Sequence, residues 1–240
     1  MSSYVSLSHL FGNPQPPDIS ASKDLATDPS LTMIDALVRA MAARDGSSRE
    51  HAERVQVYAS AVARQASISD DRLLTAIATA ALLHDVGKLA LPDRLLHKPG
   101  PLTPEEYEEV KQHAVIGADI LSAVPFPGPL AVIVRHHHEN WDGTGYPDGL
   151  EREAIPLGSR VLAIVDCYDA LTSDRPYRRA LSPDSATAMI FERRGRMYDP
   201  DITDAFLKVV WRLRTTTLNE RASNAYTTMG PRRRLEVSAR

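Results

Sequence analysis

The chain has 240 residues, of which 43% are hydrophobic and 25% charged, as expected for a globular protein that can bury one sizeable core. Its formal net charge of −3 gives no general attraction to nucleic acid, and its single cysteine excludes an internal disulfide and suits a reducing compartment. The start lacks a secretory signal, and no uncharged apolar run approaches the ~20 residues of a membrane span. We therefore expect a soluble, cytoplasmic protein without nucleic-acid or membrane partners.

Composition divides the chain into three parts. Residues 1–29 mix Ser, Pro, Asn and Asp without periodicity, which predicts a flexible leader too short for a sensory domain. Residues 215–240 also lack periodicity and include three arginines at 232–234, which predicts a flexible basic tail. Residues 30–214 carry helical periodicity without a convincing strand, and their few aromatics and many Ala and Leu favour helix packing. This middle part is predicted to be one all-α domain, a compact helical bundle.

The first three predicted helices bring two histidines and an aspartate to buried positions. After a first helix over about 30–45, the second, over about 48–66, places His51 on its apolar stripe. The stripe of the third helix runs directly into His84 and Asp85, just before a glycine and a lysine. An adjacent His and Asp can reach two metal ions at once, because a carboxylate can bridge through its two oxygens while the imidazole binds one ion.

A capping box marks the start of the fourth helix. Thr103 is its expected N-cap, Pro104 takes the first helical position and Glu106 closes the box. On this helix His113 shares a face with apolar residues three and four positions away, so it is predicted to point into the core.

The next helix begins at about Pro129 and ends in three consecutive histidines and a glutamate. Four-residue steps from Ile133 and Val134 place His137 and His138 on the same buried face. These two side chains therefore continue an apolar stripe, as His51 and His113 do on their own helices.

A loop over 141–149, rich in Gly and Pro, precedes a helix that is opened by Ile155-Pro156. This helix carries Asp166 on an otherwise apolar stripe, where a carboxylate is costly unless a cation or hydrogen-bond donors meet it. Two further helices are predicted to start at Ser182-Pro183 and Asp199-Pro200.

Seven polar side chains thus lie at the inward edges of predicted helices: His51, His84, Asp85, His113, His137, His138 and Asp166. One buried histidine is usually satisfied by a neighbour, but five of them beside two carboxylates leave too many polar groups without partners unless cations meet them. Seven ligands exceed one tetrahedral zinc and suit two six-coordinate ions. Imidazole and carboxylate ligands without a thiolate favour iron or manganese, with zinc, cobalt and nickel left open.

The ligands are predicted to divide between two divalent ions. Asp85 bridges an ion bound by His51, His84 and Asp166 to a second ion bound by His113, His137 and His138. Two such ions, two carboxylates and a bridging hydroxide sum to about one positive charge, which attracts a phosphate diester. Paired metals roughly 3.5–4 Å apart activate water and stabilise in-line phosphoryl transfer.

Three cationic side chains are candidates for substrate binding. Lys88 follows Asp85 by three residues and can reach a non-bridging oxygen or the leaving group, which makes both residues candidates for catalysis. Arg175 and Arg178 are candidates for a second phosphate or a guanine edge. For Arg178 a helix C-terminal cation or a surface ion pair is an equally good interpretation.

The same residues belong to a series of motifs that occur in order between about 45 and 206. These are His51–Val55, Leu82–Lys88, Lys98–Thr103, His113, His137–Pro147, Ala163–Asp166 and Asp169–Arg178. In order and spacing they resemble the HD-GYP family of cyclic di-GMP phosphodiesterases, a subgroup of the HD metal-dependent phosphohydrolases. The resemblance implies a compact HD-type helical bundle that hydrolyses cyclic di-GMP to pGpG, and often onward to GMP, at a centre that is usually iron.

The resemblance also implies roles for single residues and for partners. The family ligands correspond to the seven residues above, Lys88 to a lysine near the scissile phosphate and Arg175 to an arginine at the substrate. The loop of Gly145, Tyr146 and Pro147 shapes the mouth of the pocket and in some members meets diguanylate cyclase domains. Many relatives carry a receiver or sensor domain, which the leader here is too short to form. Control is therefore expected from a partner such as a diguanylate cyclase or response regulator, from expression or from the tails, in a monomer or a homodimer.

One departure from the family concerns the number of metals. Some members hold a third metal through a glutamate one helical turn before the first histidine, and Ser47 occupies that position here. Two metals are therefore predicted, and a two-metal member stops at pGpG or makes GMP slowly.

Three other functions stay open. The first is hydrolysis of another nucleotide, namely 3′,3′-cGAMP, a dNTP or an alarmone, although the Gly-Tyr-Pro loop and Arg175 argue against the last two. The second is a catalytically silent receptor for cyclic di-GMP, whose sequence sign would be lost ligands, and none is missing. The third is DNA binding through the arginines at 232–234, which a solvated tail explains better.

Overall fold

Helices make up the regular structure of this protein, described by a computed structural model over residues 29–44, 48–174 and 178–213. In chain order they are α1 (Pro29–Arg44), α2 (Ser48–Gln65), α3 (Asp71–Leu83), η3 (Val86–Ala90), α4 (Asp93–Leu96), α5 (Pro104–Ser122), α6 (Leu130–Arg135), η4 (Arg152–Ala154), α7 (Leu157–Thr172) and α8 (Pro183–Glu192). A further helix covers 200–213. Within these ranges there is no strand, only two isolated bridges, so the all-α prediction is confirmed.

Capping residues set several of the helix starts as predicted. At α5 the Thr103 hydroxyl accepts from the Glu106 N–H at 3.3 Å, and the Glu106 carboxylate accepts from the Thr103 N–H at 2.7 Å. At α8 the Ser182 hydroxyl accepts from the N–H of Ser185. At α3 the N-cap is Asp70, whose carboxylate accepts the Arg72 N–H. These caps satisfy backbone donors that a helix start leaves unpaired.

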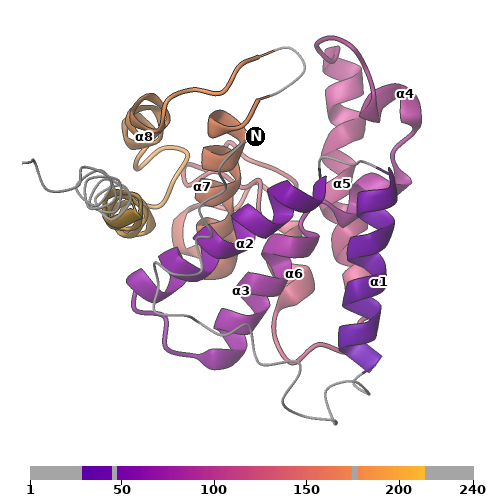
Figure 1. Ribbon diagram of the computed structural model, residues 1–240, viewed down its shortest axis with the longest axis horizontal. Coiled ribbons are helices and arrows are strands. Elements are labelled where there is room, and N and C mark those ends of the chain that lie inside the picture. Colours follow the sequence, from indigo (N-terminus) through magenta and orange to yellow (C-terminus); the bar gives the residue numbers. More distant parts are fainter. Residues whose placement is uncertain (1–28, 45–47, 175–177, 214–240) are drawn as a thin grey trace, which may run out of the picture.

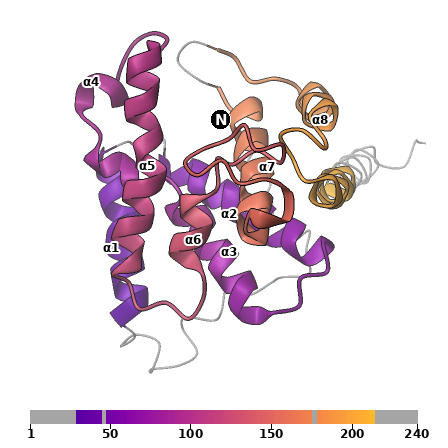
Figure 2. The ribbon, with the colours of Figure 1, turned by 180° about the vertical axis from the view of Figure 1, so that it is seen from behind.

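The helices pack around α3, which contacts α2, α6 and α7 (Figures 1 and 2). On one side α5 packs against α6 and η3, and on the other side α7 packs against α2 and α8. The core takes fully buried side chains from most of these elements, among them Val55, Ile77, Ile133, Ile164 and Phe206. Burial of their apolar area is the main force that holds the helices together.

Gly87 lets η3 lie directly against α5. A Cβ atom on this residue would come within 1.9 Å of the carbonyl oxygen of His113 and 2.6 Å of the amide nitrogen of Gly117. Any larger residue would therefore force the two segments apart. Because Asp85 immediately precedes η3, this close approach brings its carboxylate next to the face of α5 that carries His113.

The histidines that follow α6 lie just outside a helix. α6 ends at Arg135, and His136 leaves helical geometry with φ −106° and ψ 14°. His137 and His138 therefore belong to a turn. The four-residue spacing had predicted that they form the end of the helix, and that prediction is wrong. Their inward direction is nevertheless as predicted, because both approach His113 on α5.

One stretch, Asp71–Ala90, has the length and composition of a membrane span, although it carries Asp85 and Lys88. It comprises α3 and η3, and 50% of its apolar window is buried inside the bundle. This is the character of a core helix, so the stretch is weak evidence for a span.

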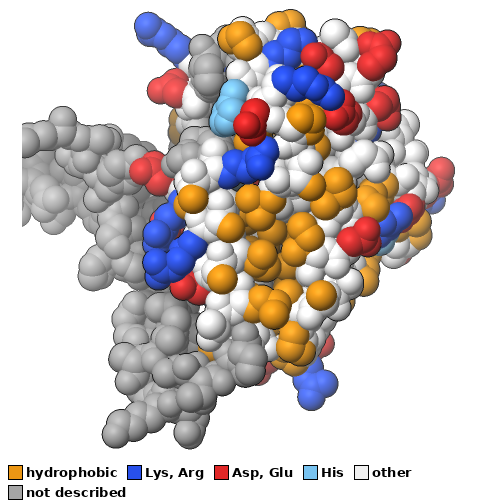
Figure 3. All heavy atoms as spheres, turned by 90° about the vertical axis from the view of Figure 1, so that its right-hand side faces the viewer, with side chains coloured by type: hydrophobic (Ala, Val, Ile, Leu, Met, Phe, Trp, Pro, Cys, Tyr) orange, Lys and Arg blue, Asp and Glu red, His pale blue; other side chains and the backbone are white. Residues whose placement is uncertain are grey.

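The face built by α1, α4 and α5 is uneven in composition. Hydrophobic side chains gather over its middle, and charged side chains gather toward its upper end (Figure 3). Several predictions from the sequence concern residues outside the described ranges: the leader before 29, the tail after 213, Ser47 and Arg175.

Candidate metal centre

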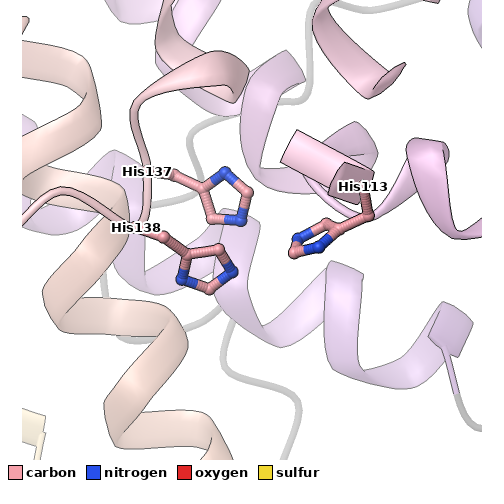
Figure 4. A group of neighbouring side chains, drawn as sticks. All are labelled: His113, His137 and His138. Atoms are coloured by element: carbon pink, nitrogen blue, oxygen red, sulfur yellow. The ribbon is translucent and has the colours of Figure 1, made fainter. Parts of the chain in front are cut away.

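The seven predicted ligands converge from segments far apart in the chain. The ligand atoms of His113, His137 and His138 all lie within 4.8 Å of one another, and the same holds for His51, His84 and Asp85. In the first group, the three imidazoles point toward one another from α5 and from the turn after α6 (Figure 4). We call this first set the imidazole-rich group.

Asp85 lies between the two sets of histidines. Its Oδ1 is 3.8 Å from His113 Nε2, and its Oδ2 is 3.6 Å from His84 Nε2. One carboxylate therefore directs one oxygen toward each set, which is the geometry that a ligand shared by two ions requires. The ammonium of Lys88 donates to the same Oδ2 at 2.7 Å, so a positive charge already lies beside the shared carboxylate.

Asp166 joins the second set from α7. Its Oδ1 lies 3.3 Å from His51 Nε2 and 3.7 Å from His84 Nε2, and those two nitrogens are 3.2 Å apart. We call His51, His84, Asp85 and Asp166 together the carboxylate-rich group. Four side chains, from the helices α2 and α7 and from the turn between α3 and η3, thus present nitrogen and oxygen atoms to a common point.

The histidines are held by their Nδ1 atoms and direct Nε2 inward. Nδ1 lies within hydrogen-bond distance of the carbonyl oxygen three residues earlier in each of three cases: His84 to Ala81 at 2.9 Å, His113 to Val110 at 2.7 Å and His137 to Val134 at 2.6 Å. A carbonyl only accepts, so Nδ1 carries the proton and Nε2 keeps its lone pair. This is how metal-binding histidines are usually oriented.

Two of these nitrogens show that a cation fits the site. Nε2 of His113 and Nε2 of His137 are buried and have no hydrogen-bond partner in the described part of the protein. A buried acceptor without a partner is unfavourable, and a divalent ion accepts such a lone pair. The donor set of imidazole nitrogen and carboxylate oxygen, without sulfur, fits a first-row transition metal.

The electrostatics of the two groups differ. Burial lowers the pKa values of His113, His137 and His138, that of His138 to about 3. Burial also acts to lower the pKa of His51, but its hydrogen bonds to Asp166 and Asp169 outweigh it and raise this pKa to about 9. The imidazole-rich group is therefore neutral at pH 7, whereas the carboxylates around His51 attract positive charge.

Asp85 stays ionised although it is buried. Burial alone would raise its pKa, but Lys88 and the surrounding histidines lower it well below the ordinary value. The same balance operates at Asp166, where burial acts to raise the pKa but interactions led by the hydrogen bond from His51 lower it. Both carboxylates are consequently in the form that binds a metal.

Sequence reasoning missed Asp169 as a part of this site. Its Oδ2 accepts a hydrogen bond from His51 Nδ1 at 2.7 Å, and Arg54 donates to Oδ1 at 2.6 Å and to Oδ2 at 3.0 Å. The carboxylate is nearly buried, with 3% of its side chain exposed. The sequence did contain a sign of this role: Asp169 follows Asp166 by three residues, so both lie on the same stripe of the helix.

Glu139 was missed as well. This carboxylate is 3% exposed and accepts the backbone N–H groups of Asp148 at 2.8 Å and Leu150 at 3.2 Å. It thereby folds the loop of residues 139–150 back onto the end of the histidine run. The folded loop leaves no room for a side chain at Gly145, since a Cβ atom there would lie 2.2 Å from the amide nitrogen of Asn140.

The predicted substrate contacts are distributed around the centre. Tyr146 lies against His138, with ring centroids 4.9 Å apart, so the Gly-Tyr-Pro loop borders the imidazole-rich group. Arg178 instead donates to the carbonyl oxygens of Ala170 and Leu171, at the C-terminal end of α7. This is the structural role that the sequence left open for Arg178, and its contact with substrate stays a prediction.

A helical bundle with paired groups of histidine and aspartate, joined by a shared carboxylate, defines the class of metal-dependent phosphohydrolases. The family model for the HD domain matches residues 35–202, more than half of the chain. The chain belongs to the HD domain family, whose phosphohydrolases use divalent metals, and its resemblance to the HD-GYP members is confirmed.

Similarity to known proteins agrees with this family. The chain is 44% identical over 177 residues to the cyclic di-GMP phosphodiesterase response regulator RpfG of Xanthomonas campestris, covering 73% of this chain and 47% of RpfG. It is 38% identical over 179 residues to the 3′3′-cGAMP-specific phosphodiesterase 3 of Vibrio cholerae, covering 74% and 38% of the two chains. It thus spans less than half the length of either relative.

A solved structure shows the same fold. Bd1817, a HDG"Y"P protein from Bdellovibrio bacteriovorus, aligns with a TM-score of 0.56 at 21% sequence identity. The alignment covers 68% of this chain and 52% of that one. At this identity the likeness concerns the fold, and it confirms the HD-type bundle.

Proposed function

We propose that this protein is a phosphodiesterase that hydrolyses cyclic di-GMP to pGpG, and on to GMP slowly, with two divalent metal ions. The observation that carries the proposal is the position of Asp85, whose two oxygens face separate histidine groups. A shared carboxylate is what a two-metal phosphodiester hydrolase requires. The names of the relatives, above all the cyclic di-GMP phosphodiesterase at 44% identity, support the choice of substrate.

The proposed ligands follow the two groups. His51, His84, Asp85 and Asp166 would hold one ion, and His113, His137 and His138 would hold the other, with Asp85 shared. Nitrogen and oxygen donors without a thiolate favour iron, with manganese second. When bound, the ions would supply Lewis acidity and an activated water for attack on phosphorus.

The side chains of the chain would orient the reaction. Lys88 lies 2.7 Å from the Asp85 carboxylate with 36% of its side chain exposed, so its ammonium can also meet a phosphate oxygen or the leaving group from the open side. Tyr146 borders His138 at the mouth and would confine the substrate there. Arg54 and Asp169 would hold the ring of His51 in place from behind.

A hybrid cyclic dinucleotide is the second candidate substrate. It is favoured by the 38% identity to a 3′3′-cGAMP-specific phosphodiesterase, although the identity to the cyclic di-GMP enzyme is higher. Parallel turnover assays with both nucleotides separate the two. A catalytically silent receptor is a third candidate, and it would bind cyclic di-GMP without turnover after Mn²⁺ or Fe²⁺ is restored.

We infer that the protein acts in the cytoplasm and that its control involves protein partners. The single cysteine suits a reducing compartment. The name of the first relative includes a response regulator, and this chain spans 47% of that protein. That name supports a response regulator as a partner, and a diguanylate cyclase is the other partner we propose.

The decisive experiment compares Asp85→Asn with wild type in metal content and turnover of cyclic di-GMP. Wild type should hold about two metals per chain. The variant should lose metal and more than about 100-fold in activity, because losing even a supporting group lowers metal affinity or activity by up to about 100-fold. Asp204→Asn is the matched control, since Asp204 is half-exposed and pairs with Arg194 on the surface. Wild-type-like hydrolysis by Asp85→Asn would contradict the shared-ligand role.

A further inference from the structure

Tyr107 and Lys111, which have no role in the proposed reaction, lie next to Tyr146 beside the imidazole-rich group. Tyr107 and Lys111 are one turn apart on α5, the helix that also carries His113. The Tyr107 ring meets the Tyr146 ring edge-on, with centroids 6.4 Å apart and an angle of 82°. Tyr146 in turn lies against His138 at 4.9 Å. Two successive ring contacts thus connect the metal centre to Tyr107.

The exposed ring in this series is that of Tyr107. The residue is 47% exposed, one of the few large hydrophobic side chains in the described structure that are so open. Tyr146 is covered more, because His138 lies against it and the Lys111 ammonium lies 5.4 Å from its centroid. Tyr107 therefore offers more open ring surface to an incoming planar group than Tyr146 does.

Lys111 holds the two tyrosines together and adds charge at the same place. Its ammonium lies 5.0 Å from the Tyr107 centroid, within the range of a cation–π interaction. It also donates to Glu108 at 2.6 Å, which limits its motion. The Tyr107 ring is consequently braced before any ligand arrives.

We propose that Tyr107, braced by Lys111 and Tyr146, is a stacking platform for a nucleobase of the substrate. This inference rests on the proposed function, because it assumes that a phosphate of the substrate is held at the metal centre. One ribose separates a phosphate from its base, so the base of a nucleotide bound at the centre can extend as far as the row of rings. Stacking on tyrosine is a sequence-tolerant way to hold a base.

In this proposal two surfaces bind different parts of the substrate. The metal centre binds phosphate, which every phosphodiester offers, whereas Tyr107 responds only to a ligand that carries an aromatic base. The binding of a nucleotide should therefore depend on Tyr107 more than the binding of inorganic phosphate does. That difference separates a stacking role from a structural role, which would affect both ligands equally.

The test is calorimetric titration of the full chain, loaded with Mn²⁺, with GMP and with inorganic phosphate. Tyr107→Ala should weaken GMP binding by about 5- to 100-fold, the range that removal of one base–aromatic stack gives, and leave phosphate binding unchanged. Tyr107→Phe keeps the ring and should bind GMP within about threefold of wild type. Phe191→Ala removes another exposed aromatic, 56% exposed on α8 at the far side of the bundle, and should change neither affinity (Figures 1 and 2).

Two results would overturn the platform: unchanged GMP affinity in Tyr107→Ala, or an equal loss for GMP and phosphate. Neither depends on turnover. If wild type hydrolyses no cyclic dinucleotide, the proposed function fails, but the comparison of GMP with phosphate still decides the role of Tyr107.

Discussion

Asp85 joins the carboxylate-rich group, of which it is a member, to the imidazole-rich group, and the two groups are built differently. In the imidazole-rich group, His113 and His137 are fixed by backbone carbonyls, and burial lowers the pKa values of all three members. In the carboxylate-rich group, His51 lies between Asp166 and Asp169, and its pKa is raised to about 9. The first group therefore offers neutral nitrogen, and the second offers negative charge.

This difference indicates which half of the centre depends on the other. The carboxylate-rich group holds Asp166 and has Asp169 behind it, so it attracts a cation by itself. The imidazole-rich group contains no carboxylate of its own and needs Asp85 for charge. Asp85 reaches it only because η3 packs closely against α5, which in turn requires Gly87. We expect the carboxylate-rich group to bind its ion more tightly.

The largest effect is expected where that packing is broken. In Gly87→Ala the new methyl group would lie 1.9 Å from the backbone oxygen of His113, and no side-chain rotation relieves a clash with backbone. The free energy of unfolding should fall by about 3 kcal/mol, the upper part of the range for overpacking. Denaturant unfolding measures this, and metal analysis should show loss from the imidazole-rich group first.

Gly100→Ala is the matched control for this substitution. A Cβ atom on Gly100 meets nothing within 4 Å, so its free energy of unfolding should stay within about 1 kcal/mol of wild type. If the two variants have the same free energy of unfolding, the close approach of η3 to α5 does not hold Asp85 in place.

An intermediate effect is expected at Asp169, which supports only the carboxylate-rich group. In Asp169→Asn the ring of His51 loses the carboxylate that accepts its Nδ1 proton, and Arg54 loses the charged group that accepts two of its hydrogen bonds. Metal affinity at this group should fall by about 10- to 100-fold, as for other supporting groups behind metal ligands. Titration with Mn²⁺ measures this, with exposed Asp119→Asn as control. An equal loss of affinity for both ions would contradict the prediction that Asp169 supports only the carboxylate-rich group.

The smallest effect is expected at Glu139, which is a member of neither group and holds the loop that follows the histidines. In Glu139→Gln the amide NH₂ would face a backbone N–H of Asp148 or Leu150, so one buried donor loses its acceptor. This costs about 1–3 kcal/mol of loop stability. Because the loop carries Tyr146, KM for cyclic di-GMP should rise about tenfold while metal content stays constant. The control is Glu153→Gln, a substitution of an exposed glutamate on η4. Loss of metal in Glu139→Gln would contradict this prediction, because it would show that the loop is needed for metal binding.

The two groups also differ in how much of them could be predicted from the sequence. Helical periodicity identified the inward direction of His51, His113 and Asp166, because a polar residue on an apolar stripe stands out. It did not identify Asp169 as a partner of Arg54, since the two lie 115 positions apart and only the packing of α7 against α2 joins them. Long-range contacts of this kind leave no periodic signal in a single sequence.

The turn after α6 shows a second limit. Four-residue spacing extended the helix through His137 and His138, whereas the chain leaves helical geometry at His136. The side chains still point inward because the His137 ring bonds to the Val134 carbonyl oxygen, which the end of the helix leaves without an intrahelical partner. Competition between side chain and backbone for that carbonyl decides the helix end, and spacing alone does not report it.

The central claim is that Asp85 is shared by two metal ions. A crystal structure of the Mn²⁺-loaded protein, with anomalous scattering measured at the metal edge, tests it most directly. We predict two anomalous peaks roughly 3.5–4 Å apart, one beside each oxygen of Asp85. A single peak, or two peaks of which only one lies beside Asp85, would contradict it.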